Sequence, residues 1–420
     1  MSTKTLNGNV SILSGYPFSS SDFSRESGIP LIRIRDIKNG ITEINFSGHY
    51  QKEYIVENGD ILIGMDGDFN VVRWQGSQAL LNQRVCKVSS NSADIHQGFL
   101  FWYLIPHLYE IHKSTPQTTV RHLSIKNLYK IPYPKFSYNE QSWISETLDT
   151  LDIRMQQTML LITKLKLVKE GLLHDLLTRG IGVDGQLRPT FQQAPSLYKK
   201  SPLGWIPKEW STDDLDSALS NIDAGRSPSC PDTPARTGEW GVLKVSAVHP
   251  DGFRAHENKL VEQTELQDQR YEVKSGDLLI TRANTPELVG LPCLVHTDRE
   301  RLMLSDKTLR LHVKEGYEKA FIFISLTQPY VRSQIQIAAT GTSMSMKNIS
   351  QNSLKRLNMK FPPHSEQVLI AERILDAGRR ISEENALLKK MEQQKAGLMN
   401  DLLTGRVRVT ELLNHQPPVQ

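Results

Sequence analysis

The sequence predicts an α+β protein built twice from one module, a β-rich domain followed by a long helix. The first observation is a motif, Lys-x-Gly-Leu-x-x-Asp-Leu-Leu-Thr, that ends at Thr178 and again 226 residues later at Thr404. The second is a long helical periodicity that leads into each copy of the motif, and the third is a series of matching β-rich segments. A chain with such a repeat is expected to present two related surfaces.

The composition is that of an ordinary globular protein. The 420 residues leave room for two to four domains, and 38% of them are hydrophobic and 23% charged. No apolar run approaches the roughly 20 residues that span a membrane, so no membrane partner is expected. Cys86, Cys230 and Cys293 are far apart in the chain, which excludes a disulfide framework and a cysteine-based zinc site. We expect a cytoplasmic location.

The same helical pattern of apolar residues, which we call a seam, occurs twice in the chain. Alternate steps of four and three residues connect ten positions between Ile144 and Leu176, of which eight are apolar. Adding 226 to each gives ten positions between Ile370 and Leu402, again with eight apolar residues and with the polar ones at the same two steps. The pattern predicts two helices of about 40 residues, each roughly 60 Å long. Two such seams in one chain most simply bury each other.

The β-rich segments before the helices correspond at an offset that increases along the chain. The matched pairs are 31–35 with 242–246 (offset 211), 57–63 with 274–280 (offset 217) and 82–85 with 305–308 (offset 223). From Leu123 and Ile349 onward the offset is 226. Insertions therefore separate the copies only inside the β-rich parts, and variable loops on a fixed frame are a common way to vary specificity.

These patterns predict six regions. They are a first β-rich domain at 1–138, a first long helix at 139–180, a linker at 181–205, a second β-rich domain at 206–363, a second long helix at 364–405 and a tail at 406–420.

No catalytic signature is found in the sequence. Gly180-Ile-Gly-Val-Asp-Gly185 has the spacing of a dinucleotide loop, but it follows a helix instead of a strand, so a helix cap and linker is the better interpretation. His107 and His112 are five residues apart and do not share one helical face as metal ligands would. We therefore expect no catalytic residue, no metal site and no cofactor bound by this chain.

Two kinds of surface remain as candidates for recognition. Gly59-Asp60 and Gly276-Asp277 each precede a short apolar strand and are interpreted as tight turns, while the loops that follow those strands differ between the copies. A second surface precedes each long helix, at 118–124 and 341–347, and combines hydroxyl side chains with basic side chains. This mixture suits phosphate oxygens and base edges, although a solvated turn is an equally good interpretation.

Net charge does not by itself favour a nucleic-acid partner. Residues 1–138 carry 14 Lys+Arg against 11 Asp+Glu, and residues 201–360 carry 20 of each. Because phosphate neutralisation supplies much of the affinity for DNA, a neutral domain needs basic groups clustered on one face, or a partner that supplies phosphate contacts.

Taken together, these features resemble the specificity subunit of type I restriction–modification enzymes. The resemblance is carried by the two motif copies, by Arg179-Gly-Ile-Gly-Val-Asp-Gly-Gln-Leu-Arg188, by Gly204-Trp-Ile-Pro-Lys-Glu-Trp210 and by the Gly-Asp-Leu-Leu-Ile turn and strand. It covers nearly the whole chain. The first copy departs from it, since it has no Gly-Trp-x-Pro opening and begins near Val10.

The resemblance implies a non-catalytic reader of double-stranded DNA. The two helices would pack as an antiparallel coiled coil and set the spacer between two half-sites, each read by one β-rich target-recognition domain. Two methyltransferase subunits and the restriction, or translocase, subunits would be the partners. These partners would hold S-adenosylmethionine, ATP and magnesium. The competing interpretation is a coiled-coil scaffold whose paired β-rich domains bind proteins.

Candidate residues follow from loop position and side-chain type. The expected DNA contacts are Arg33, Arg35, Asp66, Asp68, Arg73, Gln83, Arg84, Thr118, Thr119, Arg121, Lys244, Arg282, Asn284, Lys307, Thr342, Ser343 and Lys347. The residues expected in the helix pair or at a partner are Lys169, Gly171, Leu172, Asp175, Leu176, Lys395, Gly397, Leu398, Asp401 and Leu402.

Overall fold

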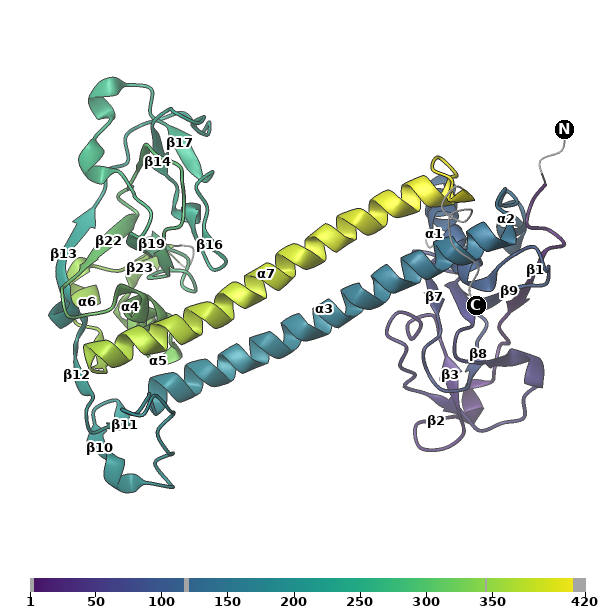
Figure 1. Cartoon of the computed structure of the whole chain (residues 1–420), viewed down its shortest axis with the longest axis horizontal. Coiled ribbons are helices and arrows are strands. Elements are labelled where there is room, and N and C mark those ends of the chain that lie inside the picture. Colours follow the sequence, from purple (N-terminus) through teal and green to yellow (C-terminus); the bar gives the residue numbers. More distant parts are fainter. Residues whose placement is uncertain (1–3, 117–120, 344–345, 411–420) are drawn as a thin grey trace. The chain divides into compact units, whose positions relative to one another are not determined.

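The computed structural model describes residues 4–116, 121–343 and 346–410, and the chain divides into two compact units (Figure 1). The first unit combines residues 1–161 with 384–420, and the second consists of residues 162–383. Each unit contains one β-rich domain and a segment of both long helices. The predicted α+β class with two β-rich domains is confirmed.

The first domain contains two sheets and two short helices. Its elements are β1 (Val10–Ser14), β2 (Phe23–Ser24), β3 (Ile29–Ile32), β4 (Asn45–Phe46), β5 (Ile55–Val56), β6 (Ile61–Gly64), β7 (Val71–Arg73), β8 (Ala79–Leu81), β9 (Val85–Ser90), α1 (Gln97–Ser114) and α2 (Ile125–Tyr129). One sheet has the order β1-β9-β6-β7 and is antiparallel throughout. The other has the order β2-β4-β3-β8-β5, in which β3 and β8 are parallel.

The second domain repeats this arrangement with more elements. They are β10 (Tyr198–Ser201), β11 (Gly204–Pro207), β12 (Ser211–Asp214), β13 (Leu219–Ala224), β14 (Gly241–Leu243), β15 (Val248–His249), β16 (Gly252–Phe253), β17 (Asn258–Leu260), β18 (Leu278–Thr281), β19 (Ala283–Asn284), β20 (Pro292–Leu294), β21 (Leu302–Met303), β22 (Thr308–Val313), α4 (Lys319–Leu326), α5 (Pro329–Ala338), β23 (Thr340–Ser343), β24 (Met346–Asn348), α6 (Gln351–Lys355) and β25 (Asn358–Phe361). The antiparallel sheet β13-β22-β18-β20 matches the first sheet of the first domain. The parallel pair of β14 and β21 matches β3 and β8.

Both predicted Gly-Asp turns are tight turns that lead into buried strands. Gly59 and Gly276 have φ angles of 91° and 88°, in the left-handed region that favours glycine. The carboxylates of Asp60 and Asp277 each accept a hydrogen bond at 2.9 Å from the backbone N–H three residues earlier. The strands that follow, β6 and β18, are completely buried.

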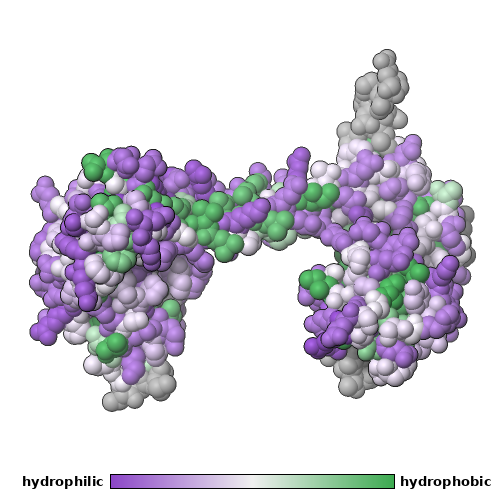
Figure 2. Space-filling view, turned by 90° about the horizontal axis from the view of Figure 1, so that it is seen from below, coloured by the Kyte–Doolittle hydropathy of each residue, from purple (hydrophilic) through white to green (hydrophobic). Residues whose placement is uncertain are grey.

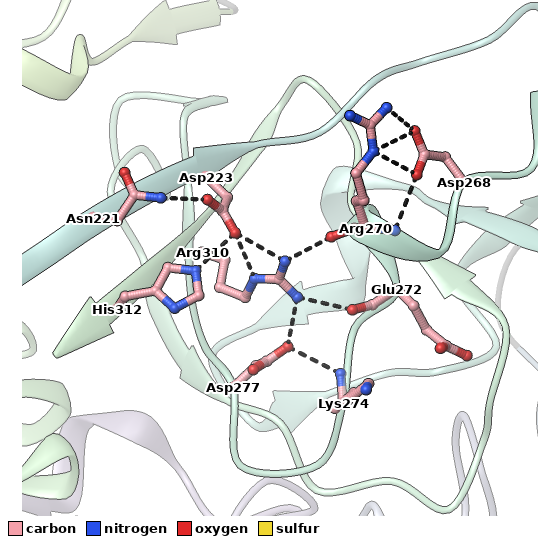
Figure 3. A network of polar contacts seen from close by, with 9 residues as sticks. All are labelled: Asn221, Asp223, Asp268, Arg270, Glu272, Lys274, Asp277, Arg310 and His312. Carbon is pink, nitrogen blue, oxygen red and sulfur yellow. Dashed lines mark hydrogen bonds and ion pairs between the residues drawn. The ribbon is translucent and has the colours of Figure 1, made fainter.

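A buried arginine reinforces this turn in the second domain. The guanidinium of Arg310, which is 11% exposed, pairs with Asp277 at 3.2 Å and with Asp223 at 2.9 Å (Figure 3). It also donates to the backbone carbonyls of Arg270 and Glu272. Five hydrogen bonds leave this cation fully occupied, so Arg310 stabilises the domain and is not available to a ligand.

The first domain has a simpler version of the same network. Lys87 pairs with Asp60 at 3.3 Å and donates to the carbonyl of Ile55 at 3.0 Å. In the second domain the added carboxylate of Asp223 also pairs with His312 at 2.7 Å. Burial would raise the pKa of Asp223, but hydrogen bonds from His312 and Arg310 outweigh it, so the pKa lies below its ordinary value.

The long helices are α3 (Tyr138–Thr178) and α7 (His364–Leu403), within two residues of the ranges 139–180 and 364–405. All ten seam positions of each helix are buried or half-buried. In the first unit, Ile144 and Leu148 share a core with Leu402, and in the second unit Leu176 shares a core with Ile370 and Ile374. The start of one helix thus meets the end of the other, which makes the pairing antiparallel in both units. Gly180, with a φ of 66°, ends α3 as a cap, as predicted.

A Glu-Gln pair at the start of each long helix is buried at the same offset of 226. The amide oxygen of Gln141 accepts the N–H of His96, which caps α1, at 2.9 Å. The amide oxygen of Gln367 accepts the N–H of Glu318, which caps α4, at 3.0 Å. Each glutamine therefore fixes a long helix to the first helix of its own domain.

The glutamate of each pair receives an arginine from the chain beyond the other long helix. Arg408 donates to both oxygens of Glu140 at 2.9 and 2.8 Å and lowers the pKa of this carboxyl to about 2. Glu366 accepts two bonds from Arg188, at 2.5 and 2.9 Å. The predicted linker 181–205 is therefore packed structure, with the β10–β11 hairpin extending past its end, and the tail returns to the first domain as far as residue 410.

Replacing Glu366 with alanine is expected to lower the free energy of unfolding by about 3–5 kcal/mol, because a buried cation loses its only anionic partner of comparable burial. Arg188 is 10% exposed, and the side-chain N–H of Trp210 would lose its acceptor as well. The control is Arg379→Ala, which removes an exposed ion pair with Asp376 on the same helix and should cost less than about 1 kcal/mol. Urea denaturation of both variants measures the difference, and equal costs would contradict a structural role for Glu366.

Candidate nucleic-acid interface

Three segments that are distant in sequence meet at one edge of the first domain. The N–H of Met65, just after β6, donates to the carbonyl of Arg84 at 3.0 Å. The N–H of Leu123 donates to the carbonyl of Met65 at 2.7 Å, and that of Gly67 to the carbonyl of Arg121 at 3.0 Å. We call residues 64–68, 82–84 and 121–123 the first basic edge. They unite the two surfaces that the sequence marked separately.

The side chains of this edge form a small ionic cluster. The Asp66 carboxylate pairs with Arg84 at 2.6 Å and with Nδ1 of His122 at 2.7 Å. Arg84 and His122 are 57% and 59% exposed, whereas Asp66 is only 18% exposed. Arg121 is half-buried and contacts the ring of His112 at 2.9 Å. Asp66 therefore holds two exposed side chains in place, and we assign it to positioning.

The second domain forms the equivalent edge with equivalent hydrogen bonds. The N–H of Arg282 donates to the carbonyl of Lys307 at 2.8 Å, and the N–H of Ile349 donates to the carbonyl of Arg282 at 2.9 Å. Arg282, Lys307 and Ile349 lie 217, 223 and 226 residues after Met65, Arg84 and Leu123, respectively. These equal the offsets found in the sequence. We call residues 281–285, 305–307 and 346–349 the second basic edge.

Basic side chains occupy matched positions on the two edges. Lys307 stands where the first edge has Arg84, and Lys347 stands where it has Arg121. Lys347 is half-buried and donates to the carbonyl of Gly341 at 2.9 Å. Arg282 is exposed and has no basic counterpart, because Met65 occupies that place. The edges therefore share cations and differ in the groups between them.

Two of the arginines expected to contact DNA pair with carboxylates inside the fold. Arg33 is 18% exposed and pairs with Asp36 at 2.9 Å and with Glu43 at 3.0 Å. Arg73 pairs with Asp149 of α3 at 2.5 Å and donates to the carbonyl of Gly98 at 2.8 Å. Because these guanidinium groups already have carboxylate partners inside the fold, we assign both to structural roles. Arg73 joins the first domain to α3.

The remaining candidates lie on or near the edges. Arg35, Gln83 and Asp68 are exposed, and Asp68 lies 3.4 Å from Lys38. Asn284 is half-buried and accepts the N–H of Thr285. Lys244 is 27% exposed and pairs with an aspartate. Thr118 and Thr119 lie outside the described residues, and Thr342 and Ser343 belong to β23 with side chains that are not described.

The duplicated motif contributes to the helix pair at its leucines and lysines. Leu176 and Leu402 are buried, and Leu172 and Leu398 are half-buried. Lys395 pairs with Asp152 of α3 and lies over the ring of Trp102 at 4.7 Å. The matching Lys169 faces Gly378. This glycine lies 226 residues after Asp152, so the second copy has a glycine at the position of the aspartate. Asp175 and Asp401 pair with arginines just beyond their helices.

The motif glycines have no structural explanation within the described residues. Gly171 and Gly397 are exposed, and apart from neighbouring helix backbone no described atom lies within 4 Å of the place that a Cβ would take. In the first unit, Gly397 and Leu398 line a groove with Trp143, Thr147 and Thr150 of α3, with a volume of about 770 Å³. We call it the Gly397 groove.

Residues 4–116, 121–343 and 346–410 contain neither a candidate metal cluster nor a candidate membrane span. Within these ranges no group of three or more His, Cys, Asp and Glu side chains could hold a metal ion. The same part of the chain contains no helix that is long and apolar enough to cross a membrane.

Sequence analysis missed two sets of residues. His122 was not selected beside Arg121, and its role depends on a contact with Asp66, 56 residues earlier. The buried pairs Glu140-Gln141 and Glu366-Gln367 were also missed, although they recur at the offset of 226 and the repeat carried a signal for them.

Comparisons with known proteins agree with this architecture. A family model described as the type I restriction modification DNA specificity domain matches residues 2–166. The chain is 28% identical over 387 residues to the specificity subunit of the type I restriction enzyme EcoBI of Escherichia coli, covering 87% of this chain and 76% of that one. It is 32% identical over 203 residues to the EcoEI specificity subunit of Escherichia coli, covering 48% of this chain and 33% of that one. The crystal structure of a type I restriction–modification S subunit from M. genitalium has the same fold, with a TM-score of 0.62 at 13% identity, covering 96% of this chain and 95% of that one.

Proposed function

This chain belongs to the specificity subunits of type I restriction–modification systems, and from that premise we propose that it reads a bipartite DNA target through its two basic edges. The observation that carries the proposal is the repetition of one edge in two domains with equivalent backbone hydrogen bonds and matched cations at Arg84 and Lys307. Each edge would contact one half-site. The half-sites would differ because the side chains between the cations differ.

Physical chemistry favours this division of labour. Lysine and arginine bind phosphate oxygens and base edges, and contacts to phosphates fix the register while contacts to bases specify the sequence. The exposed Arg282 of the second edge has the buried Met65 as its counterpart, and Asn348 has His122, so the two edges present different donors and acceptors from the same frame. An asymmetric target is the expected result.

The helix pair is proposed to bind two methyltransferase subunits. A glycine late in a helix costs about 1 kcal/mol relative to alanine, and no contact among the described residues offsets that cost at Gly171 or Gly397. A partner that approaches the helix backbone closely would explain both. Hydrophobic side chains are also exposed along the long helices (Figure 2); on α3 they are Ile153, Met159, Leu160, Leu161, Leu167 and Val168.

In this proposal the chemistry belongs to the partners. The methyltransferase subunits would hold S-adenosylmethionine and extrude the target adenine from the duplex. The restriction subunits would use ATP and magnesium. The specificity subunit would supply the position of the target base and the distance between the half-sites, without a reacting group of its own.

Substitution of one cation on each edge tests the proposal. Arg84→Ala is expected to relax one half of the methylated target and Lys307→Ala the other, each at a cost of about 1–3 kcal/mol if the side chain contacts a base. Methylation-site sequencing of the assembled methyltransferase would identify the half that changes. Lys200→Ala removes an exposed charge on the β10–β11 hairpin and should leave both halves intact. If all three variants methylate the original target equally well, the proposal fails and the protein-binding scaffold becomes the better interpretation.

A further inference from the structure

A polar hollow lies beside the second basic edge. It has a volume of about 580 Å³ and is lined by three lysines from separate parts of the domain. Lys244 follows β14, Lys259 belongs to β17, and Lys307 belongs to the turn before β22. Asp232 and Asp306 are the acidic residues of the lining. Because Lys307 belongs to both features, the hollow continues the edge.

Asp232 holds two of these lysines together. Its carboxylate lies 2.9 Å from Nζ of Lys244 and 3.4 Å from Nζ of Lys259, and hydrogen bonds from these lysines lower its pKa. The aspartate side chain is 74% exposed, and ion pairs that exposed contribute little to stability. A phosphate of a polyanion such as DNA can therefore take its place between the two lysines at little cost.

We propose that this hollow binds a DNA backbone phosphate, which displaces Asp232 from Lys244 and Lys259. The inference rests on the proposed function and adds to it a phosphate site beside the base-reading contacts. It answers the charge problem of a domain with 20 basic and 20 acidic residues, since three lysines gathered at one hollow provide the local positive charge that the domain average does not.

The first domain has no equivalent arrangement at the position of Lys244. The sequence match with offset 211 aligns Lys244 with Arg33, which is enclosed by Asp36 and Glu43. Asp36 is buried, so it cannot leave as easily as the exposed Asp232. The second domain would therefore hold the DNA backbone more strongly than this part of the first domain does.

Cys230 provides a direct reporter of occupancy. It lines the hollow and is half-buried, whereas Cys86 and Cys293 are buried in their domains. Burial raises the pKa of the Cys230 thiol, so alkylation will be slow, but Cys230 remains the most accessible of the three cysteines. A backbone phosphate in the hollow would protect it.

The test uses the full chain and a mixed-sequence synthetic duplex. Binding is measured by fluorescence anisotropy at several salt concentrations. Lys259→Ala is expected to weaken binding several-fold and to reduce the slope of log K against log salt by about 1, because one phosphate contact is lost. Asp232→Asn is expected to strengthen binding several-fold at low salt. The matched controls are Lys200→Ala, an exposed lysine on β10, and Asp251→Asn, an exposed and paired aspartate elsewhere in the domain.

Alkylation of Cys230 by a maleimide should become slower when the duplex is added, and this protection should be lost in Lys259→Ala at moderate salt. Affinity unchanged in Lys259→Ala and Asp232→Asn, or Cys230 unprotected by bound duplex, would overturn the phosphate site. That result is distinct from failure of the proposed function, in which Arg84→Ala and Lys307→Ala would also leave DNA binding and the methylated target unchanged. Weaker binding in Asp232→Asn would mean that the aspartate itself contacts DNA, and it would overturn the displacement.

Discussion

Replacing residues 1–138 with the corresponding domain of another specificity subunit is expected to change one half of the methylated target completely and to leave the other half unchanged. The first basic edge lies entirely within these residues, and backbone hydrogen bonds join its segments 64–68, 82–84 and 121–123 to one another. The second edge is built only from residues beyond 280. A discrimination of several kcal/mol per half-site should therefore transfer with the domain.

The graft must retain the contacts that join the domain to the helices. Arg73 pairs with Asp149, and the N–H of His96 donates to Gln141, so an incoming domain needs an arginine at the first position and a helix cap at the second. A graft without the arginine serves as the control, since it should lose stability and not specificity. Methylation-site sequencing reads both halves at once. Changes in both halves of the target would contradict independent reading.

Replacing Gly397 with phenylalanine is expected to remove one of two methyltransferase subunits from the assembly while the specificity subunit stays folded. A Cβ at this position would meet no described atom within 4 Å apart from neighbouring helix backbone, and the Gly397 groove beside it leaves room for the ring, so we expect the ring to obstruct a docked partner and not the fold. Gly397→Ala should slightly stabilise the helix, by up to about 1 kcal/mol, and weaken docking less. Gly171→Phe should have the corresponding effect at the other copy of the motif.

Mass photometry of the reconstituted complex counts the bound subunits. Each single phenylalanine variant should shift the dominant species from two methyltransferase subunits to one, and the double variant should shift it to none. Urea denaturation of the free specificity subunit should show that the substitutions leave it folded. If two subunits remain bound in the double variant, the glycines do not mark the docking sites. Unfolding of the single variants would instead show an intramolecular role for these glycines.

The repeat made most of the fold predictable from sequence. Positions that recur on one helical face in both copies are expected to be buried. The seam positions between Ile144 and Leu176 are indeed buried or half-buried without exception. The offset between the two copies increases along the β-rich parts, because strands that pair in the fold keep their register while their loops change length. The same offsets separate the equivalent hydrogen bonds of the two edges. The same matches aligned Arg84 with Lys307 before any contact was known.

Charge type alone could not separate structural cations from exposed ones. Arg33 and Arg73 were selected as DNA contacts by charge, and their partners in the fold, Asp36 and Asp149, are identified only when the chain is folded. The pairing of Asp66 with His122 depends in the same way on a contact across 56 residues. Sequence marks which residues carry charge, and the fold decides which of these charges remain available to a ligand.

The packing of the predicted linker also could not be read from the sequence. The sequence divides the chain where periodicity changes, and it assigned 181–205 to a linker. In the structure this segment contains Ile181 and Tyr198, both buried, and it provides Arg188 to the carboxylate of Glu366. A mixed segment with glycine and proline has no periodicity, so its packing could not be inferred from its pattern.

Because the first unit is built from two distant parts of the chain, it cannot finish folding before the second unit has been synthesised. Its core includes Leu402, Leu403 and Val409 together with residues near the N-terminus, whereas the second unit is one continuous stretch from 162 to 383. Domains usually fold in the order of their synthesis. Here the half that is translated first stays incomplete until residues 402–409 have been synthesised, and the half that is translated later can be finished before it. A message truncated between residues 383 and 402 would yield a chain with only its second unit whole.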